Sequence, residues 1–251
     1  FEVDSSGLYI KAGTILDFET KTSYSVTVSV DDPAAGTTPD ASTSFTLTVT
    51  DVVNETPVHA TVFISEVAPW SSGNSPLAAD WFEVTNTGST AIDITGWKVD
   101  DNSDSFASAV ALSGITSIAA GESVIFIETA DLASARAAFL STWFGANPPA
   151  NLQIGSYSGS GVGLGTGGDA VNLYDSHNVL QASVTFGASP AGPFATFDNA
   201  AGLNNATISM LSVAGTNGAF VAANDTKETG SPGEITPVNT PPTITSPAAA
   251  S

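Results

Sequence analysis

The chain has 251 residues, enough for one or two domains, and 42% of them are hydrophobic, which is enough for a sizeable core. Its 25 acidic residues outnumber 5 basic ones, and the formal net charge of -20 repels nucleic acid and anionic lipid and attracts cations. The sequence contains no cysteine, which excludes a disulfide framework, a cysteine-based zinc site and a thiol nucleophile.

The composition also bears on where the protein works. A bias towards Thr, Ser, Ala, Gly and Val, with very few Lys, is typical of a secreted bacterial protein, so we expect an extracellular or cell-surface location. No signal peptide and no run of about 18 apolar residues is found, so membrane insertion is not expected. The chain starts at Phe1 rather than at a methionine, and we expect a fragment or a processed product.

Short alternating runs fill the first 57 residues. Tyr24–Val30 and Phe45–Val49 alternate apolar with small polar residues, which predicts two half-buried strands. The stretch Asp31–Ser44, with its Asp, Pro and Gly residues, is predicted to be the hairpin loop between them.

Four motifs in this segment resemble the C-terminal half of a cadherin-like repeat. They are Phe-x-Val-Asp-x-x-Gly at the start, Leu-Asp-Phe-Glu at 16–19, Tyr-x-Val-x-Val-x-x-Asp from Tyr24, and Asp-Val-Val-Asn-Glu-Thr-Pro at 51–57. The resemblance implies a partial cadherin-like β-sandwich over residues 1–58. Because half a sandwich exposes sheet edges and an apolar face, we expect the missing strands upstream or in a neighbouring subunit.

The same resemblance implies a calcium site between successive domains. In cadherin-like repeats the acidic residues of these motifs bind calcium, which takes about six to eight oxygen ligands. The matching positions are Glu19 and Asp51, while Asn54, Glu55 and Asp17 offer further oxygens. The alternative is that these acids are solvated turn residues.

The stretch Asp80–Asp101 is central to the rest of the chain and is predicted to form two strands joined by a tight connection. Thr61–Val67 and Ser123–Glu128 are predicted strands on either side of it. The intervening loop, Ala68–Ala79, is predicted to be exposed and to carry Trp70 as a candidate contact residue.

Several of these segments together are similar to the lamin-tail domain. The motifs are ISEV at 64–67, DWFEVTNTGSTAIDITGWKVDD at 80–101, AAGESVIFIE at 119–128, VNLYD at 171–175 and ETGSPG at 228–233. The resemblance covers about residues 60–235. It implies an all-β fold, an immunoglobulin-like β-sandwich with one inserted helix. It implies little about function, because function belongs to sites rather than to folds.

One helix is predicted, at residues 131–144. Asp131 can cap its start and Gly145 can end it. Its apolar residues fall on one face, which indicates core packing rather than a binding groove; they are Leu132, Ala135, Phe139, Leu140 and Trp143.

The predictions for the remaining segments follow the same patterns. Residues 151–168 are predicted to be a Gly/Ser loop, followed by a strand pair at 169–174 and 183–186. Irregular loops with short strands are expected up to residue 225. Residues 236–251 are rich in proline and are predicted to link to a further domain.

Three motifs have the residue types of chemical sites. Gly163–Gly168 satisfies G-x-G-x-x-G, but a strand rather than a helix is expected after it, so it is interpreted as a loop. His177 is interpreted as a turn residue because nothing places a serine nucleophile against it. Asp100, Asn102 and Asp104 have EF-hand spacing without the required Gly and Glu, which favours a solvated hairpin loop.

The sequence as a whole predicts a non-catalytic extracellular module, a spacer or adhesion segment of a larger secreted bacterial protein. Its expected partners are neighbouring domains of the same polypeptide or copies of itself. One alternative is a self-assembling subunit of a filament or surface layer that uses β-strand complementation. Others are an accessory domain of a secreted phosphatase, esterase or nuclease, or an uncharacterised hydrolase suggested only by loops rich in Ser, Asp and Gly.

Overall fold

The structure is a computed structural model of the whole chain. It describes residues 1–4, 7–11, 22–34, 36, 38–49, 61–70, 77–199, 203 and 206–234. The described residues form β-strands and one α-helix, which confirms the predicted all-β class. The chain divides into two compact units, Phe1–Glu55 and Thr56–Ser251, and each has its own sheets.

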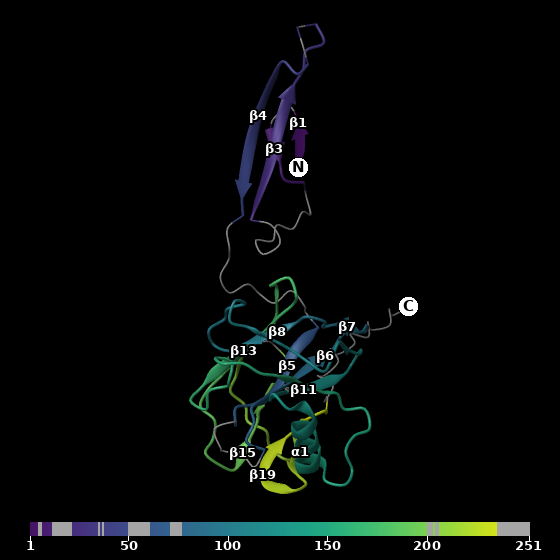
Figure 1. The fold of residues 1–251 in the computed structure, drawn as a ribbon, viewed down its shortest axis with the longest axis vertical. Helices are drawn as coiled ribbons and strands as arrows, with labels where there is room; N and C mark the ends of the chain where they lie inside the picture. The colour runs from purple at the N-terminus through teal and green to yellow at the C-terminus, as the bar shows by residue number, and fades with distance from the viewer. Residues whose placement is uncertain are drawn as a thin grey trace, which may run out of the picture. The chain divides into compact units, whose positions relative to one another are not determined.

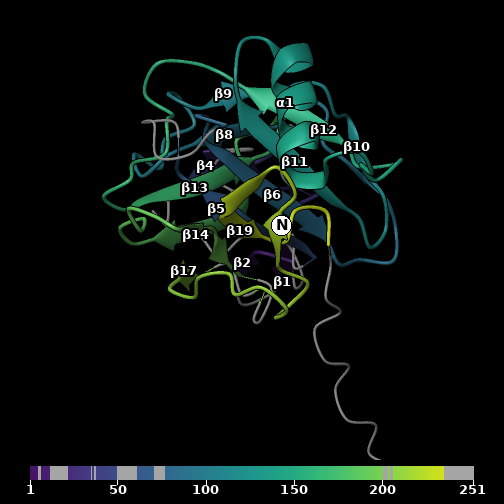
Figure 2. The ribbon, with the colours of Figure 1, turned by 90° about the horizontal axis from the view of Figure 1, so that it is seen from below.

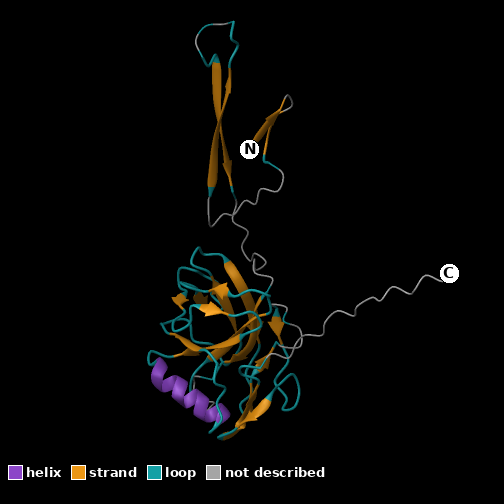
Figure 3. Cartoon of the chain, turned by 90° about the vertical axis from the view of Figure 1, so that its right-hand side faces the viewer, coloured by secondary structure: helices purple, strands orange, loops and turns teal. Residues whose placement is uncertain are grey.

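The first unit contains two antiparallel hairpins (Figures 1 and 3). β1 (Glu2–Asp4) pairs with β2 (Gly7–Tyr9), and β3 (Ser23–Val30) pairs with β4 (Ala41–Thr48) along the full length of both strands. The alternating pattern predicted the two strands, but the loop between them is shorter than the predicted 31–44, because β4 begins at Ala41, and β4 is mostly exposed rather than half-buried.

The second unit is built on two five-stranded sheets. The first sheet has the order β12-β11-β6-β5-β16, and the second has the order β17-β14-β13-β8-β9. The first sheet is formed by β5 (Val62–Ala68), β6 (Trp81–Asn86), β11 (Ser123–Glu128), β12 (Ile154–Tyr157) and β16 (Phe197–Asp198). The second is formed by β8 (Lys98–Asp100), β9 (Val110–Ala111), β13 (Asp169–Tyr174), β14 (Leu180–Phe186) and β17 (Thr207–Ile208). A short pair, β7 (Ile92–Asp93) and β10 (Ser117–Ile118), completes the sandwich.

Side chains from both sheets form one hydrophobic core. Successive residues of a strand point to opposite faces, so Phe82 of β6 points between the sheets whereas Trp81 and Glu83 point to the outer face. Phe82 stacks on Phe126 of β11, with ring centroids 5.6 Å apart. Phe186 of β14 contacts Phe197 of β16 between the sheets, with ring centroids 5.1 Å apart, so the two sheets pack as the predicted sandwich.

Helix α1 (Leu132–Phe144) packs on the outer face of the first sheet, and Figure 2 shows it beside β11 and β12. Asp131 caps it, since its carboxylate accepts the Ser134 N–H at 3.2 Å. Phe139 and Trp143 are buried against Trp81, which confirms the predicted helix and its apolar face. Within the described part of the chain, no helix has the length and apolar character needed to cross a membrane.

A third, three-stranded sheet also covers this outer face. It consists of β15 (Phe194–Ala195), β19 (Asp225–Gly230) and β18 (Phe220–Ala222), in that order. Phe220 contacts Trp143, and Phe194 contacts Trp70, with ring centroids 5.8 and 6.1 Å apart. The first sheet is therefore buried on both faces, and the unit has three layers.

Three predictions are corrected by the structure. The strands of Asp80–Asp101 do not pair, because β6 belongs to the first sheet and β8 to the second, so this stretch crosses between sheets. Trp70 is fully buried rather than exposed, because its ring packs against Trp81 at 6.1 Å. The predicted Gly/Ser loop contains β12, which runs parallel to β11.

Candidate functional site

The candidate site is built on two glutamates that are neighbours on adjacent strands of the first sheet. Glu66 of β5 lies opposite Glu83 of β6, just after a bulge in the register at Ile64. The two residues are 0% and 1% exposed. In the described ranges the one ion pair joins His177 to Asp175, so no described lysine or arginine forms an ion pair with either glutamate.

Glu83 accepts hydrogen bonds from a hydroxyl network and from a backbone turn. The Ser65 hydroxyl donates to Oε1 at 2.5 Å, and the Gly233 N–H donates to Oε2 at 2.6 Å. The Thr85 hydroxyl connects Ser65, at 2.8 Å, with the Ser123 hydroxyl, at 2.5 Å. One carboxylate oxygen therefore faces the sheet and the other faces the C-terminal turn.

Glu66 is held in the same way. Its Oε1 accepts the Thr196 hydroxyl and the Ser231 N–H, the latter at 2.7 Å. Thr196 Oγ1 also lies 2.6 Å from the Ser212 hydroxyl. A Cβ at position 230 would lie 2.6 Å from Glu66 Oε1, so glycine is required where the chain passes the carboxyl group. Both glutamates thus bind the backbone of the turn at 231–233.

Burial is the main cause that raises the pKa of both glutamates. It raises the pKa of Glu83 to about 7, although the hydrogen bonds from Ser65 and Gly233 partly oppose this. The pKa of Glu66 is raised well above its ordinary value, first by burial and then by the negative charge of Glu83. Near neutral pH the pair therefore retains a proton, because two adjacent buried carboxylates repel each other.

A raised pKa suits acid–base catalysis, but the geometry of this pair indicates a structural role. A catalytic carboxyl group must come within hydrogen-bond reach of a substrate. A surface groove of about 600 Å³ reaches Ser123 and Gly233, yet neither glutamate lines it. The chemical role that this arrangement supports is to fasten the C-terminal turn to the first sheet.

A second set of carboxyl groups fixes the glycine-rich loop. Asp80 Oδ2 accepts the Leu164 N–H at 2.7 Å, and Asp169 Oδ2 accepts the Gly165 N–H at 2.5 Å. Burial, and then the charge of Asp80, raise the pKa of Glu128. Amides that a phosphate-binding loop would direct at phosphate are bonded to carboxylates here, and strand β13 follows the loop. The loop interpretation is confirmed.

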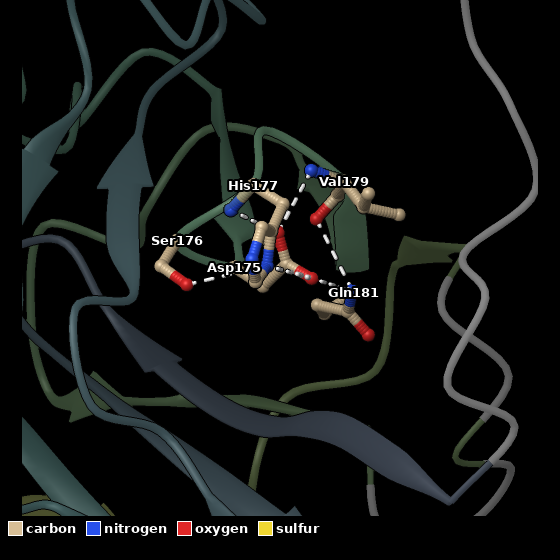
Figure 4. A network of polar contacts seen from close by, with 5 residues as sticks. All are labelled: Asp175, Ser176, His177, Val179 and Gln181. Carbon is tan, nitrogen blue, oxygen red and sulfur yellow. Dashed lines mark hydrogen bonds and ion pairs between the residues drawn. The ribbon is translucent and has the colours of Figure 1, made fainter. Parts of the chain in front are cut away.

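Figure 4 shows the turn between β13 and β14 that carries His177. Asp175 accepts the N–H groups of His177 and Val179, at 2.7 and 3.0 Å, and the Gln181 amide at 3.1 Å. His177 Nδ1 lies 3.4 Å from Ser176 Oγ and 4.0 Å from Asp175 Oδ2. Serine and aspartate thus approach the same ring nitrogen, whereas a catalytic triad places them on opposite nitrogens. His177 is a turn residue, as predicted.

The acidic loop after β8 directs its carboxylates at its own neighbours. Asp100 Oδ2 accepts the Ser103 hydroxyl at 2.6 Å and the Ser105 N–H at 2.7 Å, and Asp104 accepts the Tyr174 hydroxyl at 2.5 Å. Asp100, the last residue of β8, is buried, but Asn102, Ser103 and Asp104 are exposed, so the connection between β8 and β9 is a solvated hairpin loop as predicted. Nowhere in the described ranges do three or more His, Cys, Asp or Glu residues gather in a way that could hold a metal ion.

The predicted calcium ligands lie outside the described residues, and the calcium site stays a prediction. They are Asp17, Glu19, Asp51, Asn54 and Glu55.

Sequence reasoning did not single out the glutamate pair. Its one signal is an acidic residue inside an apolar strand, in I-S-E-V and in W-F-E-V. A glutamate in such a position is almost never buried without a partner. That Glu66 meets Glu83 depends on the register and on the bulge at Ile64, and neither can be read from the pattern.

Comparison with known proteins gives a family for the greater part of the chain. Residues 55–188 match the family model described as the Lamin Tail Domain. The matched range contains both glutamates but ends before Thr196, Ser231 and Gly233, which hold them. No curated protein and no solved structure matches the chain.

Proposed function

Because the chain belongs to the lamin tail domain family, whose fold is an immunoglobulin-like sandwich, we propose that it serves as a non-catalytic structural module. The observation that carries this proposal is the use made of the buried glutamates. Glu66 and Glu83 accept the backbone N–H groups of Ser231 and Gly233, so they close the fold instead of facing a substrate.

At a finer level, we propose an extracellular spacer or adhesion segment of a larger secreted bacterial protein. The acidic, cysteine-free composition rich in Thr, Ser, Ala and Gly supports this role. So does the resemblance of residues 1–58 to part of a cadherin-like repeat, joined to the lamin-tail-like domain at 60–235 and a proline-rich linker at 236–251. The partners are neighbouring domains or further copies. An accessory domain of a secreted phosphatase, esterase or nuclease is the alternative.

A hydrolase screen tests the non-catalytic role. We expect no turnover of carboxylic esters, phosphate esters or nucleic acid above the buffer rate between about pH 5 and pH 9, the range in which a group like Glu83 titrates. Turnover by the intact chain that the Glu83→Gln variant abolishes would overturn the proposal and make the buried pair a catalytic site.

Calcium binding tests the spacer role. We propose that Glu19 and Asp51, with the neighbouring oxygen ligands, bind Ca²⁺ and stiffen the joint between domains. Calorimetry on the intact chain is expected to show binding that a Glu19→Ala and Asp51→Ala variant loses. A variant with Glu2→Ala and Asp31→Ala makes the same charge change at exposed positions and is expected to bind normally. An equal loss of calcium binding in both variants would show that the net negative charge of the chain attracts the ion and that these residues form no site.

A further inference from the structure

The turn that precedes β18 contains the one Asn-Gly step in the sequence, Asn217-Gly218. Both residues adopt left-handed backbone conformations, with φ values of +48° and +79°, and the Ala219 N–H closes the turn on the Thr216 carbonyl at 2.8 Å. Two consecutive left-handed residues are typical of a type I′ turn, which asparagine followed by glycine forms most readily. The Asn-Gly step therefore lies at the tip of a short turn.

An Asn-Gly step can react with itself. The backbone nitrogen of the second residue attacks the side-chain amide carbon of the asparagine, and glycine permits this best because it has no Cβ to block the approach. Gly218 is exposed, and its N–H donates no hydrogen bond in the described part of the chain. As the Gly218 nitrogen bonds to Cγ of Asn217, it loses its proton, the C–N bond of the side-chain amide breaks, and ammonia leaves with that proton. Water then opens the resulting succinimide ring, which gives aspartate or isoaspartate.

The side chain of Asn217 lies next to a row of buried acids. Its amide donates to Asp198 Oδ2 at 3.2 Å, and Asp198 is 3% exposed. The register places Asp198 opposite Glu66, and Glu66 opposite Glu83, on three adjacent strands. Burial is the largest cause of the raised pKa of each glutamate, and the negative charge of Asp198 raises both further. A carboxylate in place of the Asn217 amide would therefore add a like charge at hydrogen-bond distance from Asp198.

We propose that Asn217 is a site of spontaneous deamidation, and that its conversion to aspartate or isoaspartate weakens the packing of this loop on β16. The loop contacts β16 through the Asn217 amide and through the antiparallel bridge between Leu211 and Phe197. Conversion replaces the amide donor by a carboxylate, which Asp198 repels. The modified chain thus carries one more negative charge beside the acids of the first sheet. The reaction needs only water and the chain itself, so it does not depend on the proposed structural role.

Peptide mapping by mass spectrometry, on the intact chain held under mildly alkaline conditions, tests the site. The peptide that contains Asn217 is expected to gain the mass difference between asparagine and aspartate and to separate into aspartate and isoaspartate forms. Asn178 is the internal control, because it is also left-handed, with a φ of +69°, but Val179 follows it. The Val179 N–H is bonded to Asp175 at 3.0 Å, so the attacking nitrogen there is both crowded and occupied. Conversion at Asn217 no faster than at Asn178 would overturn the site.

A second measurement tests the effect of the modification on the fold. Asn217→Asp introduces the aspartate product directly, and Asn147→Asp makes the same charge change at an exposed position. In urea unfolding followed by tryptophan fluorescence, Asn217→Asp is expected to lower the folding equilibrium constant by at least about tenfold, because a hydrogen bond to a carboxylate is lost and a like charge is added. Asn147→Asp is expected to change it by less than about threefold. Equal effects of the two substitutions would overturn the proposed weakening of the loop.

Discussion

At the scale of single residues, the pair Glu66 and Glu83 is an unfavourable feature of the buried interior. Both carboxyl groups are buried and pair with no described lysine or arginine, and like groups directly opposite in a sheet destabilise it. The pair is held because each oxygen that points at the C-terminal turn accepts a backbone N–H. The stability of the folded protein should therefore depend on whether this pair is protonated.

The first prediction concerns pH. The pKa of Glu83 is 4.5 in its ordinary state and about 7 in the fold, so the folded protein keeps a proton that the unfolded chain loses. The stabilisation that this proton gives the folded state is fully present below pH 4.5 and is lost as the pH rises through 7. The free energy of unfolding should fall by roughly 3 kcal/mol over that interval, since each pKa unit corresponds to about 1.4 kcal/mol. Urea unfolding followed by tryptophan fluorescence at several pH values measures it.

Two variants isolate the cause of this pH dependence. Glu83→Gln removes the titrating group and leaves an amide oxygen for the Gly233 N–H, so the fall in stability should shrink. Glu234→Gln changes the charge equally at an exposed position and should keep the full fall. An unchanged pH profile in Glu83→Gln would assign the effect to other groups, with Glu66 the first to test by the same substitution.

The second prediction concerns Asn86, a buried residue at the end of β6. Its amide donates to the backbone carbonyls of Thr90, Ile118 and Ala119, at 2.8, 3.2 and 3.0 Å. Asn86→Ala leaves these acceptors without that donor and should lower the free energy of unfolding by about 2 to 3 kcal/mol. The exposed Asn147→Ala should change it by less than about 0.5 kcal/mol. Similar values for the two variants in urea titrations would contradict this role.

At the scale of elements, the turn after β19 closes the outer face of the first sheet. Gly233 adopts a φ of +82°, and a Cβ there would lie 3.0 Å from Leu152. The same backbone conformation occurs at Gly121, with a φ of +71° and no atom within 4 Å of the added Cβ. The two glycines therefore have similar backbone conformations, but only Gly233 has a neighbouring side chain that an added Cβ would meet.

The third prediction follows from this pair. Gly121→Ala should lower stability by about 1 kcal/mol, the strain of a left-handed alanine. Gly233→Ala should cost about 1 kcal/mol more, because relief of the Leu152 contact shifts the N–H away from Glu83. It should also make stability more sensitive to pH, while Gly121→Ala should not. Thermal unfolding at pH 5 and pH 8 compares both variants, and equal losses would show that the turn does not hold the carboxyl group.

At the scale of the whole molecule, the second unit extends beyond the part that matches the lamin tail domain. The match ends at residue 188, before β16 and β17, the edge strands of the two main sheets. The small sheet that helps to bury Trp70 and Trp143 also comes from residues after 188. The matched residues alone would thus expose two sheet edges and a large part of the outer face.

The fourth prediction tests this dependence with two fragments. Residues 56–234 should fold like the second unit of the intact chain and unfold in one cooperative transition. Residues 55–188 should lack near-ultraviolet circular dichroism and should aggregate, because unpaired edges and uncovered tryptophans promote association. A well-folded, monomeric 55–188 fragment would show that the sandwich folds without the strands that follow residue 188.

Local chemistry made much of the fold predictable from the sequence. Period-two alternation predicted β3 and β4, and an aspartate cap and a glycine predicted α1; the sandwich was implied by the resemblance of the ISEV, WFEV and AAGE motifs to the lamin tail domain. The composition alone fixed the absence of thiol chemistry and the acidic charge. Each of these features depends on residues that are neighbours along the chain, which is why a pattern of a few residues suffices.

Only the tertiary structure decided which distant residues meet. Trp70 is buried because Phe194, more than a hundred positions away, packs on it. β12 forms in a glycine-rich stretch because β11 offers a parallel edge, and at Gly155 a Cβ would come within 2.5 Å of the Ser113 carbonyl oxygen. Glu66 and Glu83 become a proton-holding pair through a bulged register and a turn that follows them by some 150 residues. Register, burial and closure arise from long-range packing, and no local pattern encodes them.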